Sequence, residues 1–409
     1  MKNQTTALLL AAALPSTVFC LGFRLTDQDP VATARGGAFV ATADNPSAIY
    51  YNPAGISQLS GTHSLMSAYV IGYRATIEPD GSDRDYGSKW NPSVVPHSFY
   101  TLQPKDSPLT LGLGFYSPFG LGFQYDNNTP FRDKAIKGEL MYVTASPVAA
   151  WKFNDQLSIG VGPTINWSRA FFSNGIITPG DEFKFKGTGV SFGFVAGLMY
   201  QPTPKHSFGI AYHSSSKTTY SGHTHVHIPS FKVPIPGVGL IPVPGQDFED
   251  DADASLTFPA TIQAGYSYRP APDWNFEFDI EWTDWDSLNT STIHQSNGLD
   301  LKVPFKYRSS FLYDFGVTKK FNNGMHVSLG YIYSENSVPN EYTTPLVPDT
   351  DRHVFSVGVG GVLGNGKYTW DIAYQYAYGP SRHVSNGTSA SGDYHFESNA
   401  VSVSLGHEF

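Results

Sequence analysis

Three carboxylates, Glu277, Asp279 and Glu281, stand at alternate positions in one short stretch of the chain. Carboxylates in pairs can act as general acid and base, so this spacing could carry hydrolysis. Neighbours two apart on a strand are separated by roughly 6.6 Å, at ~3.3 Å per residue, and the sequence places no nucleophile beside them. The pattern therefore favours a second interpretation, in which they line a barrel lumen and pair with Arg269 or Arg308.

Histidines alternate in the same way at His223, His225 and His227, so on an extended segment all three face one side. Three imidazoles could hold zinc, but the surrounding residues suggest no structure that would orient them, which favours chance or weak surface binding. With 13 histidines, the sequence does not exclude a Ser–His pair of the kind found in barrel lipases. No motif indicates one. We predict no enzyme activity and no metal.

The elements that position these residues are strands. Around the three carboxylates one face carries Trp274, Phe276, Phe278, Ile280 and Trp282, and the other carries only polar side chains. This period of two is typical of a strand between two different media. A soluble β-sandwich is the alternative, but its strands average five or six residues. The predicted strands are about twice as long and carry aromatics near their ends, which favours a membrane barrel.

Fourteen such segments follow one another, an even number as a single-chain bacterial barrel requires. They lie near 62–77, 94–104, 108–118, 139–153, 156–169, 187–201, 206–220, 257–269, 273–286, 307–321, 325–334, 352–363, 368–378 and 397–409. Tight turns are predicted at 154–155, 270–272 and 322–324, and long outer loops at 78–93, 170–186, 221–256, 287–306, 335–351 and 379–396. The predicted fold is an all-β, 14-stranded antiparallel transmembrane barrel.

Composition agrees with this fold. Of 409 residues, 15% are charged and 14% are aromatic, with 40 glycines and 29 prolines. Such a balance argues against a coiled coil, a disordered chain and a helical enzyme. A net charge of −9 argues against a nucleic-acid partner, because phosphate binding requires a basic surface.

The first residues look like an export signal, with Lys2, an apolar stretch at 7–14 and the only cysteine, Cys20, at the cleavage site. A membrane anchor is the alternative, but eight apolar residues are too few to span; a lipoprotein acylated at Cys20 is another. Residues 21–60 are rich in alanine and glycine and lack alternation. We predict a signal peptide at 1–20, an N-terminal hatch at 21–60 and a barrel at 61–409.

Four stretches of the chain resemble a known family. They are Ala34–Ala38 through the Asn52-Pro53-Ala54 motif to Gly55; Phe115–Leu121; Phe258–Ala260 followed by Trp282–Trp285; and Val338–Tyr342 through Pro348–His353. Together they resemble the outer-membrane long-chain fatty acid transporter family, the FadL/TodX-type channels.

The resemblance implies a barrel plugged by the hatch, in the outer membrane of a bacterium. Family members take up fatty acids and, in some branches, aromatic hydrocarbons, without a cofactor or energy source. The ligand is caught among the outer loops, moves to a pocket that the mature N-terminus, with Phe23, helps to line, and leaves sideways where the third strand kinks. We expect a monomer whose partners are hydrophobic small molecules, membrane lipid and lipopolysaccharide.

Two loops carry apolar residues that water would not favour, residues 226–245 and the segment with Phe171, Phe172, Ile176 and Ile177. They mark either a capture site for ligand or a lid packed on neighbouring loops. Arg269, Arg308 and Arg352 are candidates for binding a ligand carboxylate.

The predicted exit lies at Ser117, Pro118, Phe119 and Gly120, where proline cannot donate to a strand ladder and glycine relaxes the backbone. The alternative is that the strand ends there and a loop begins. The alternative function is a porin or a surface adhesion barrel without lipid transport, which the hatch would distinguish, because a porin keeps its lumen open.

Overall fold

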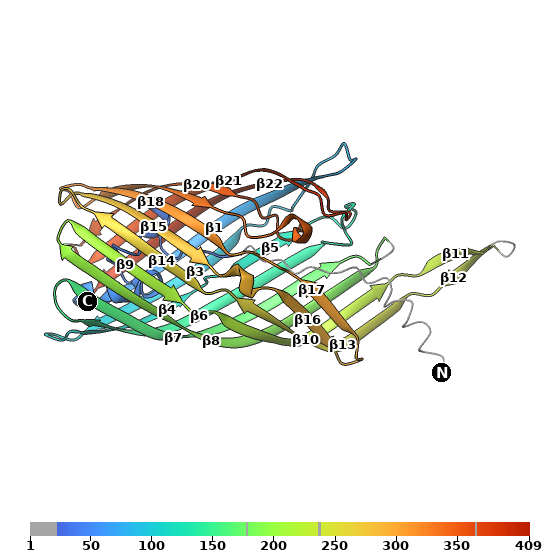
Figure 1. Cartoon of the computed structure of the whole chain (residues 1–409), viewed down its shortest axis with the longest axis horizontal. Helices are drawn as coiled ribbons and strands as arrows, with labels where there is room; N and C mark the ends of the chain where they lie inside the picture. Colours follow the sequence, from blue (N-terminus) through green and yellow to red (C-terminus); the bar gives the residue numbers. More distant parts are fainter. Residues whose placement is uncertain (1–22, 177–178, 236–238, 365) are drawn as a thin grey trace.

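The computed structural model describes residues 23–176, 179–235, 239–364 and 366–409. They form a closed antiparallel barrel of fourteen strands, several of which consist of two labelled segments (Figure 1). The segments are β1 (Gly61–Pro79), β2 (Tyr86–Gly87), β3 (Ser93–Gln103), β4 (Leu109–Tyr116), β5 (Gly120–Gln124), β6 (Lys137–Lys152), β7 (Leu157–Asn174), β8 (Glu182–Thr203), β9 (His206–His213), β10 (Ser216–Ile228), β11 (Phe231–Ile235), β12 (Gly239–Val243), β13 (Gln246–Phe258), β14 (Thr261–Tyr268), β15 (Trp274–Thr283), β16 (Thr290–Gln295), β17 (Asp300–Pro304), β18 (Ser310–Lys320), β19 (His326–Ser334), β20 (Arg352–Leu363), β21 (Tyr368–Val384) and β22 (Gly392–Glu408).

The barrel closes where β22 pairs with β1, in unbroken register from His63 opposite Glu408 to Pro79 opposite Gly392. The predicted fold class is thereby confirmed. The outward faces carry the apolar side chains, as on β7, where Val161 is 54% exposed and Trp167 40%. Exposed apolar residues on a closed barrel face lipid. No described helix has the length and hydropathy to cross a membrane.

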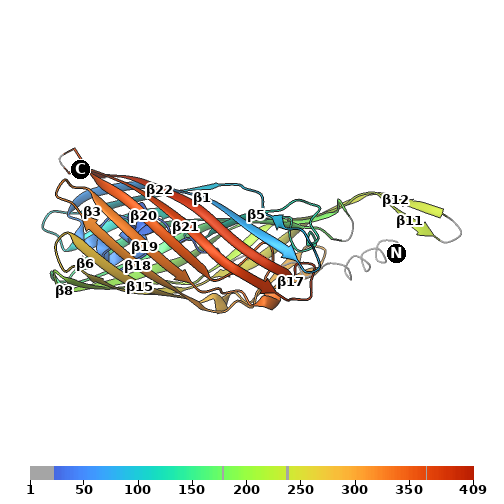
Figure 2. The same cartoon turned by 90° about the horizontal axis from the view of Figure 1, so that it is seen from above.

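Several strands extend well beyond the predicted ends. The prediction of loops at 170–186 and 221–256 is wrong, because β7 runs to Asn174, β8 starts at Glu182, and β10 pairs with β13 up to Ile228. In these extensions the outward positions are mostly polar while the inward ones stay apolar, so the sheet continues past the lipid. Beyond it β11 and β12 form a hairpin that projects from the end of the barrel (Figures 1 and 2).

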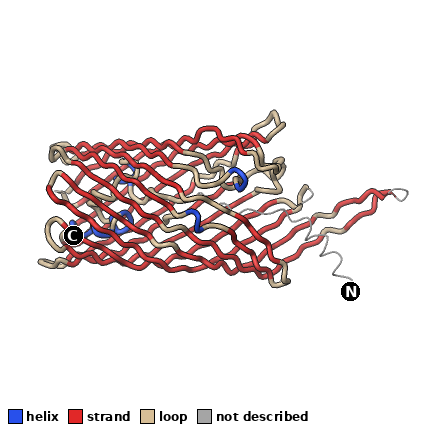
Figure 3. Tube along the Cα trace, in the orientation of Figure 1, coloured by secondary structure: helices blue, strands red, loops and turns tan. Residues whose placement is uncertain are grey.

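The N-terminal segment, residues 23–60, lies inside the barrel and holds α2 (Pro30–Ala34), α3 (Ala48–Tyr51) and the 3-10 helix η1 (Pro53–Gln58) (Figure 3). Two further 3-10 helices, η2 (Trp285–Ser287) and η3 (Asn340–Tyr342), lie between barrel strands. The segment approaches the wall so closely that a Cβ on Gly160 would lie 2.4 Å from the backbone of Pro53. Glycine is required at that wall position because any side chain would collide with the segment.

Candidate ligand cavity and lateral gap

A cavity of about 680 Å³ lies inside the barrel, bordered by the start of the N-terminal segment. Its apolar wall is largely aromatic. The ring of Phe23 lies 5.5 Å from that of Phe119 and 5.5 Å from that of Trp285, and Tyr142, Ile332 and Val354 complete this side. Cavities of this size and lining bind drug-sized or lipid-sized molecules.

The cavity also has polar groups. Arg24 and Asp27 of the N-terminal segment line it, together with Arg352 and Gln375 of the wall. Burial raises the pKa of Asp27, although Gln375 donates a hydrogen bond of 3.0 Å to its carboxylate. Burial alone would lower the pKa of Arg24, but the charge of Glu281 holds it above its usual range, so the guanidinium stays charged.

The three carboxylates of β15 hold the N-terminal segment in place. Arg24 forms an ion pair with Glu281 at 2.5 Å. Asp279 accepts hydrogen bonds of 2.8 and 2.9 Å from the amides of Phe39 and Val40. Glu277 does the same for the next two amides, at 2.8 and 2.9 Å. The prediction that these carboxylates face the lumen agrees with the structure.

The prediction that these carboxylates pair with Arg269 or Arg308 is wrong. Arg308 is exposed and Arg269 lies half-buried at the turn after β14, whereas the groups that bind the carboxylates come from the N-terminal segment. Alternation identifies the side of the wall on which a residue lies, but it carries no information about which distant segment crosses the lumen to meet it.

The predicted interruption of the third strand is present. β4 ends at Tyr116, β5 begins at Gly120, and the backbone between them bonds to the N-terminal segment. The amide of Leu25 donates to the carbonyl of Pro118 at 2.9 Å, and the amide of Gly120 donates to the carbonyl of Phe23 at 3.0 Å. The Gln28 side chain bonds both the amide and the carbonyl of Ser117, at 3.1 and 3.0 Å. These polar groups are therefore satisfied although the ladder is broken.

Beside the interruption the wall has a gap. β3 pairs with β4 only from Ser98 to Leu102, and among the described residues β5 pairs with β6 and has no ladder to β3. The cavity lining reaches Val94 of β3 and Met141 and Val143 of β6. Val94 is 65% exposed and Met141 43% on the lipid-facing surface. The cavity is thus lined by residues of both strands that flank the interruption, and we call the stretch of wall without a β3–β5 ladder the lateral gap.

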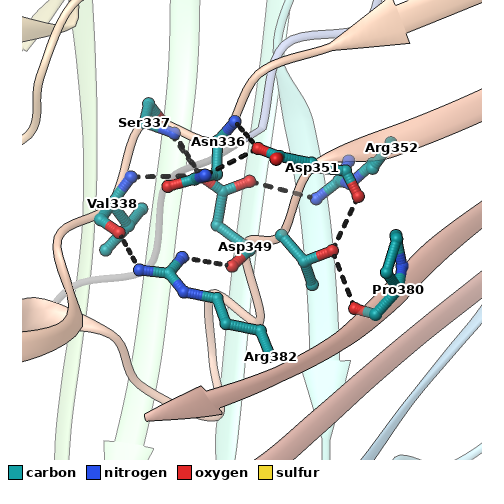
Figure 4. A network of polar contacts seen from close by, with 9 residues as sticks. Asn336, Ser337, Val338, Asp349, Asp351, Arg352, Pro380 and Arg382 are labelled. Carbon is teal, nitrogen blue, oxygen red and sulfur yellow. Dashed lines mark hydrogen bonds and ion pairs between the residues drawn. The ribbon is translucent and has the colours of Figure 1, made fainter.

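The connection between β19 and β20 lines part of the cavity with Ser337 and Asp349, and a polar network holds it to β21 (Figure 4). Arg382 donates to the carbonyls of Asp349 and Val338, each at 2.6 Å. The Asp349 carboxylate accepts from the amide of Ser337 at 2.7 Å. Burial alone would raise the pKa of Asp351, but hydrogen bonds from Asn336 hold it below its usual range. The network fixes this connection beside the cavity, and we call it the cover.

Arg352 lies between this cover and the cavity. Its guanidinium stands 4.3 Å over the ring of Phe396 and 3.5 Å from the Asp349 carboxylate. Its Nε is buried and has no hydrogen-bond partner among the described groups. Of the three arginines predicted as carboxylate ligands, only Arg352 lines the cavity. It can receive an anionic group there.

The remaining predicted site residues lie elsewhere. Asn52 donates to the carbonyls of Val40 and Leu198, at 2.8 and 3.1 Å, and Pro53 and Ala54 pack on β7, so this motif fastens the segment to the wall. Phe171 faces outward under Lys137, and Phe172 faces inward against Phe183 and Phe185. None of them lines the cavity. Ile177 and the predicted signal peptide with Cys20 lie outside the described residues.

Sequence reasoning overlooked Arg24, Gln28 and Trp285. Trp285 stands in one of the stretches that carry the family resemblance, and its spacing from Trp282 marks the point where the alternation ends. The predicted apolar loop at 226–245 is partly the β11–β12 hairpin, in which Leu240 is 63% exposed. The Leu240 side chain is therefore not packed on neighbouring loops, as the lid interpretation required. Among the residues that the structure describes, no three His, Cys, Asp or Glu side chains are placed to hold a metal ion.

Comparison with known proteins agrees with this architecture. The long-chain fatty acid transport protein of Escherichia coli O6:H1 is 22% identical over 98% of this chain and 97% of its own. Outer membrane protein P1 of Haemophilus influenzae is 22% identical over 92% and 90%.

Solved structures show the same fold. A Pseudomonas aeruginosa FadL homologue superposes with a TM-score of 0.82 at 18% identity, covering 95% of this chain and 100% of that one. The Pseudomonas putida toluene transporter TodX has a TM-score of 0.76 at 16% identity, covering 93% and 98%. A family model described as outer membrane protein transport protein (OMPP1/FadL/TodX) matches residues 11–409. The chain belongs to this family of outer-membrane transport proteins.

Proposed function

We propose that this protein carries long-chain fatty acids and similar hydrophobic molecules passively through the cavity and releases them sideways into the outer leaflet. The observation that carries the proposal is the missing β3–β5 ladder at the lateral gap, where residues of both flanking strands, among them Val94 and Met141, line the cavity. The N-terminal segment supports it, because it fills the lumen that a diffusion porin would keep open.

Hydrophobic burial supplies enough driving force for such uptake. Burying about ten methylenes of an acyl chain contributes roughly 8 kcal/mol, at ~0.8 kcal/mol each. The aromatic wall around Phe23, Phe119 and Trp285 offers a surface for the chain, and Arg352 offers a cation for its carboxylate. This combination favours fatty acids over uncharged hydrocarbons as the substrate. The carbonyl and amide groups at the interruption are bonded to the N-terminal segment, so a ligand that displaces Phe23 also acts on the gap.

The test is to restore the broken strand. Replacing Ser117-Pro118 by Val-Thr returns a donor and β propensity to the interruption. We expect the variant to fold, as judged by its heat-dependent gel migration, and to bind a labelled fatty acid. Its uptake into cells that lack other transporters of this kind should fall severely. The control introduces the same two residue types at two separate exposed serines, S389V and S296T. It accounts for any effect of added β-branched residues.

Undiminished uptake by the correctly folded strand variant would exclude the lateral route. Binding without any uptake in the wild-type protein would favour the alternative, an adhesion barrel. A large open conductance in planar bilayers would instead favour a porin.

A further inference from the structure

The edge of β5 that faces the lateral gap is held by residues from three parts of the chain. Beside the interruption, the amide of Gly120 donates to the carbonyl of Phe23 at 3.0 Å. At the other end of β5, the carbonyl of Gln124 accepts from the amide of Lys89 at 2.7 Å. Both of these contacts join backbone to backbone. Between them the edge is met by Tyr73 of β1, which reaches it with its side chain.

The hydroxyl of Tyr73 takes the place of a paired strand. It accepts a hydrogen bond from the amide of Gly122 at 2.8 Å and donates one to the carbonyl of the same residue at 2.5 Å. In an antiparallel ladder, a residue opposite Gly122 would make these two bonds through its own backbone. One side chain therefore satisfies two polar groups that the missing β3–β5 ladder leaves open, as a strand edge in a membrane requires.

Tyr73 reaches β5 because the ladder between β1 and β3 has ended. This ladder runs as far as Ile71, which is opposite Ser93, and Tyr73 is the next inward residue of β1. On its other side, the backbone of Tyr73 is held opposite Ser398 in the ladder with β22. The strand that carries the side chain is thus fixed, and the hydroxyl can leave Gly122 by a change of rotamer alone.

The ring of Tyr73 makes a second contact with β5. It meets the ring of Phe123 edge to face, with 5.0 Å between the centroids and 65° between the planes. Both side chains are almost fully buried, at 8% and 3% exposure, and both line the cavity. Since Tyr73 belongs to β1 and Phe123 to β5, the aromatic pair joins the two sides of the wall across the lateral gap, on the cavity side.

We propose that Tyr73 is the gating residue of the lateral gap. Its hydroxyl holds the edge of β5 while the gap is shut, and its side chain turns away when a bound molecule leaves the cavity. The inference rests on the proposed lateral route and adds the group that moves. The contacts at Gly120 and Gln124 can open only if a stretch of backbone is displaced. Because the ring of Tyr73 lines the cavity, an acyl chain that fills the cavity is in position to displace it.

The experiment measures how fast a fluorescent long-chain fatty acid dissociates from the purified protein in detergent micelles, after an excess of unlabelled fatty acid is added. Tyr73→Phe keeps the ring and removes the hydroxyl. The loss of one hydrogen bond between neutral groups corresponds to about fivefold, so two lost bonds should make dissociation about 5- to 25-fold faster. The matched control is Tyr394→Phe. The Tyr394 hydroxyl donates to the carbonyl of Ala390 at 2.7 Å, and neither residue lines the cavity, so the control should release at the wild-type rate.

Hydrogen exchange provides a second readout that does not depend on transport. The amide of Gly122 loses its acceptor in Tyr73→Phe, so a peptide that covers residues 120–124 should exchange about tenfold faster at this amide than in the wild type. Equal exchange in the two proteins would overturn the proposal, because the hydroxyl would then not hold the edge of β5.

The strand variant S117V/P118T separates this inference from the lateral route. We expect it to slow dissociation, and Tyr73→Phe should add little to it. If the strand variant slows release while Tyr73→Phe releases like the wild type, Tyr73 is not the gate although the lateral route stands. If the strand variant releases at the wild-type rate, the route fails and the inference fails with it.

Heat-dependent gel migration confirms that each variant has folded. If Tyr73→Phe does not fold, Phe123→Leu takes its place, because it weakens the ring contact from the other strand and leaves the hydroxyl bonds intact. It should speed dissociation several-fold, and release at the wild-type rate would overturn the proposal.

Discussion

Arg24 and Glu281 stand 257 residues apart in the chain, yet the guanidinium of one meets the carboxylate of the other at 2.5 Å across the barrel lumen. Both side chains are almost fully buried, at 10% and 2% exposure. The pair ties the start of the N-terminal segment to the wall directly below the cavity. Removing one partner leaves a buried charge without compensation.

Arg24→Gln should therefore release the segment. We expect a loss of about 3–5 kcal/mol in its attachment, seen as faster proteolysis of residues 23–60 and as higher single-channel conductance in planar bilayers. The double variant R24Q/E281Q should recover much of the loss, because no charge is left unpaired. A double variant as damaged as Arg24→Gln alone would contradict this role for the pair.

Protonation of Asp29 should make stability depend on pH. Burial, followed by the charge of Asp371, raises the pKa of Asp29 to about 7, whereas an unperturbed aspartate has a pKa of about 3.9. Between these values the folded chain keeps a proton that the unfolded chain has lost. The free energy of unfolding therefore falls as the pH rises from about 4 to about 7 and then levels off.

Asp29→Asn should remove this contribution. The amide oxygen can still accept from Asn45, which donates to Asp29 at 2.8 Å. We expect the variant to be more stable than the wild type at pH 8, by up to ~4 kcal/mol for a shift of about three pKa units, and equal to it near pH 4. Melting temperatures in detergent at both pH values test this. A variant that is no more stable than the wild type at pH 8 would show that ionised Asp29 does not destabilise the folded protein.

Charge on the lipid-facing wall should be costly, and charge beyond it should not. Val161→Arg places a guanidinium among exposed apolar residues of β7, which should lower the free energy of unfolding by about 2–4 kcal/mol. Ser221→Arg lies on the outward face of β10 beyond the apolar residues and should change it by less than about 0.5 kcal/mol. Urea unfolding in lipid vesicles measures both. Similar losses would mean that the two positions face the same medium.

Arg352 should separate charged from uncharged ligands. Arg352→Gln removes the one arginine that the described wall residues contribute to the cavity lining, and a hydrogen bond to a charged group contributes about 1.5–3 kcal/mol. Binding of a fatty acid should weaken about 10- to 100-fold, while binding of the corresponding alkane should stay within about twofold. Isothermal titration in detergent provides both numbers. Equal weakening of the two ligands would mean that Arg352 only supports the cover.

The sequence predicted those parts of the fold in which polar and apolar side chains alternate with a period of two. Around β15 the alternation separates Phe276 and Phe278, which face lipid, from Glu277 and Asp279, which face the lumen. The same logic failed at 170–186 and 221–256, because strands beyond the membrane carry polar residues outside and resemble loops in hydropathy.

Contacts across the lumen could not be predicted from the sequence. Whether Glu281 meets Arg24, Arg269 or Arg308 depends on the path of the N-terminal segment through a closed barrel, which no local pattern records. The interruption at Pro118 could be predicted from its chemistry. The bonds that Gln28 supplies to its edges could not, because they join residues far apart in sequence.

The bonds from Phe23, Leu25 and Gln28 to the interruption also bear on how the protein is made. A barrel that inserted without its N-terminal residues in place would leave the carbonyl of Pro118 and the amide of Gly120 without these partners. Phe23, Leu25 and Gln28 are thus synthesised before the strand whose interruption they complete. Biogenesis must therefore keep this end of the chain available until the third strand has been laid down, and a nascent barrel that loses it to proteolysis would be leaky as well as unplugged.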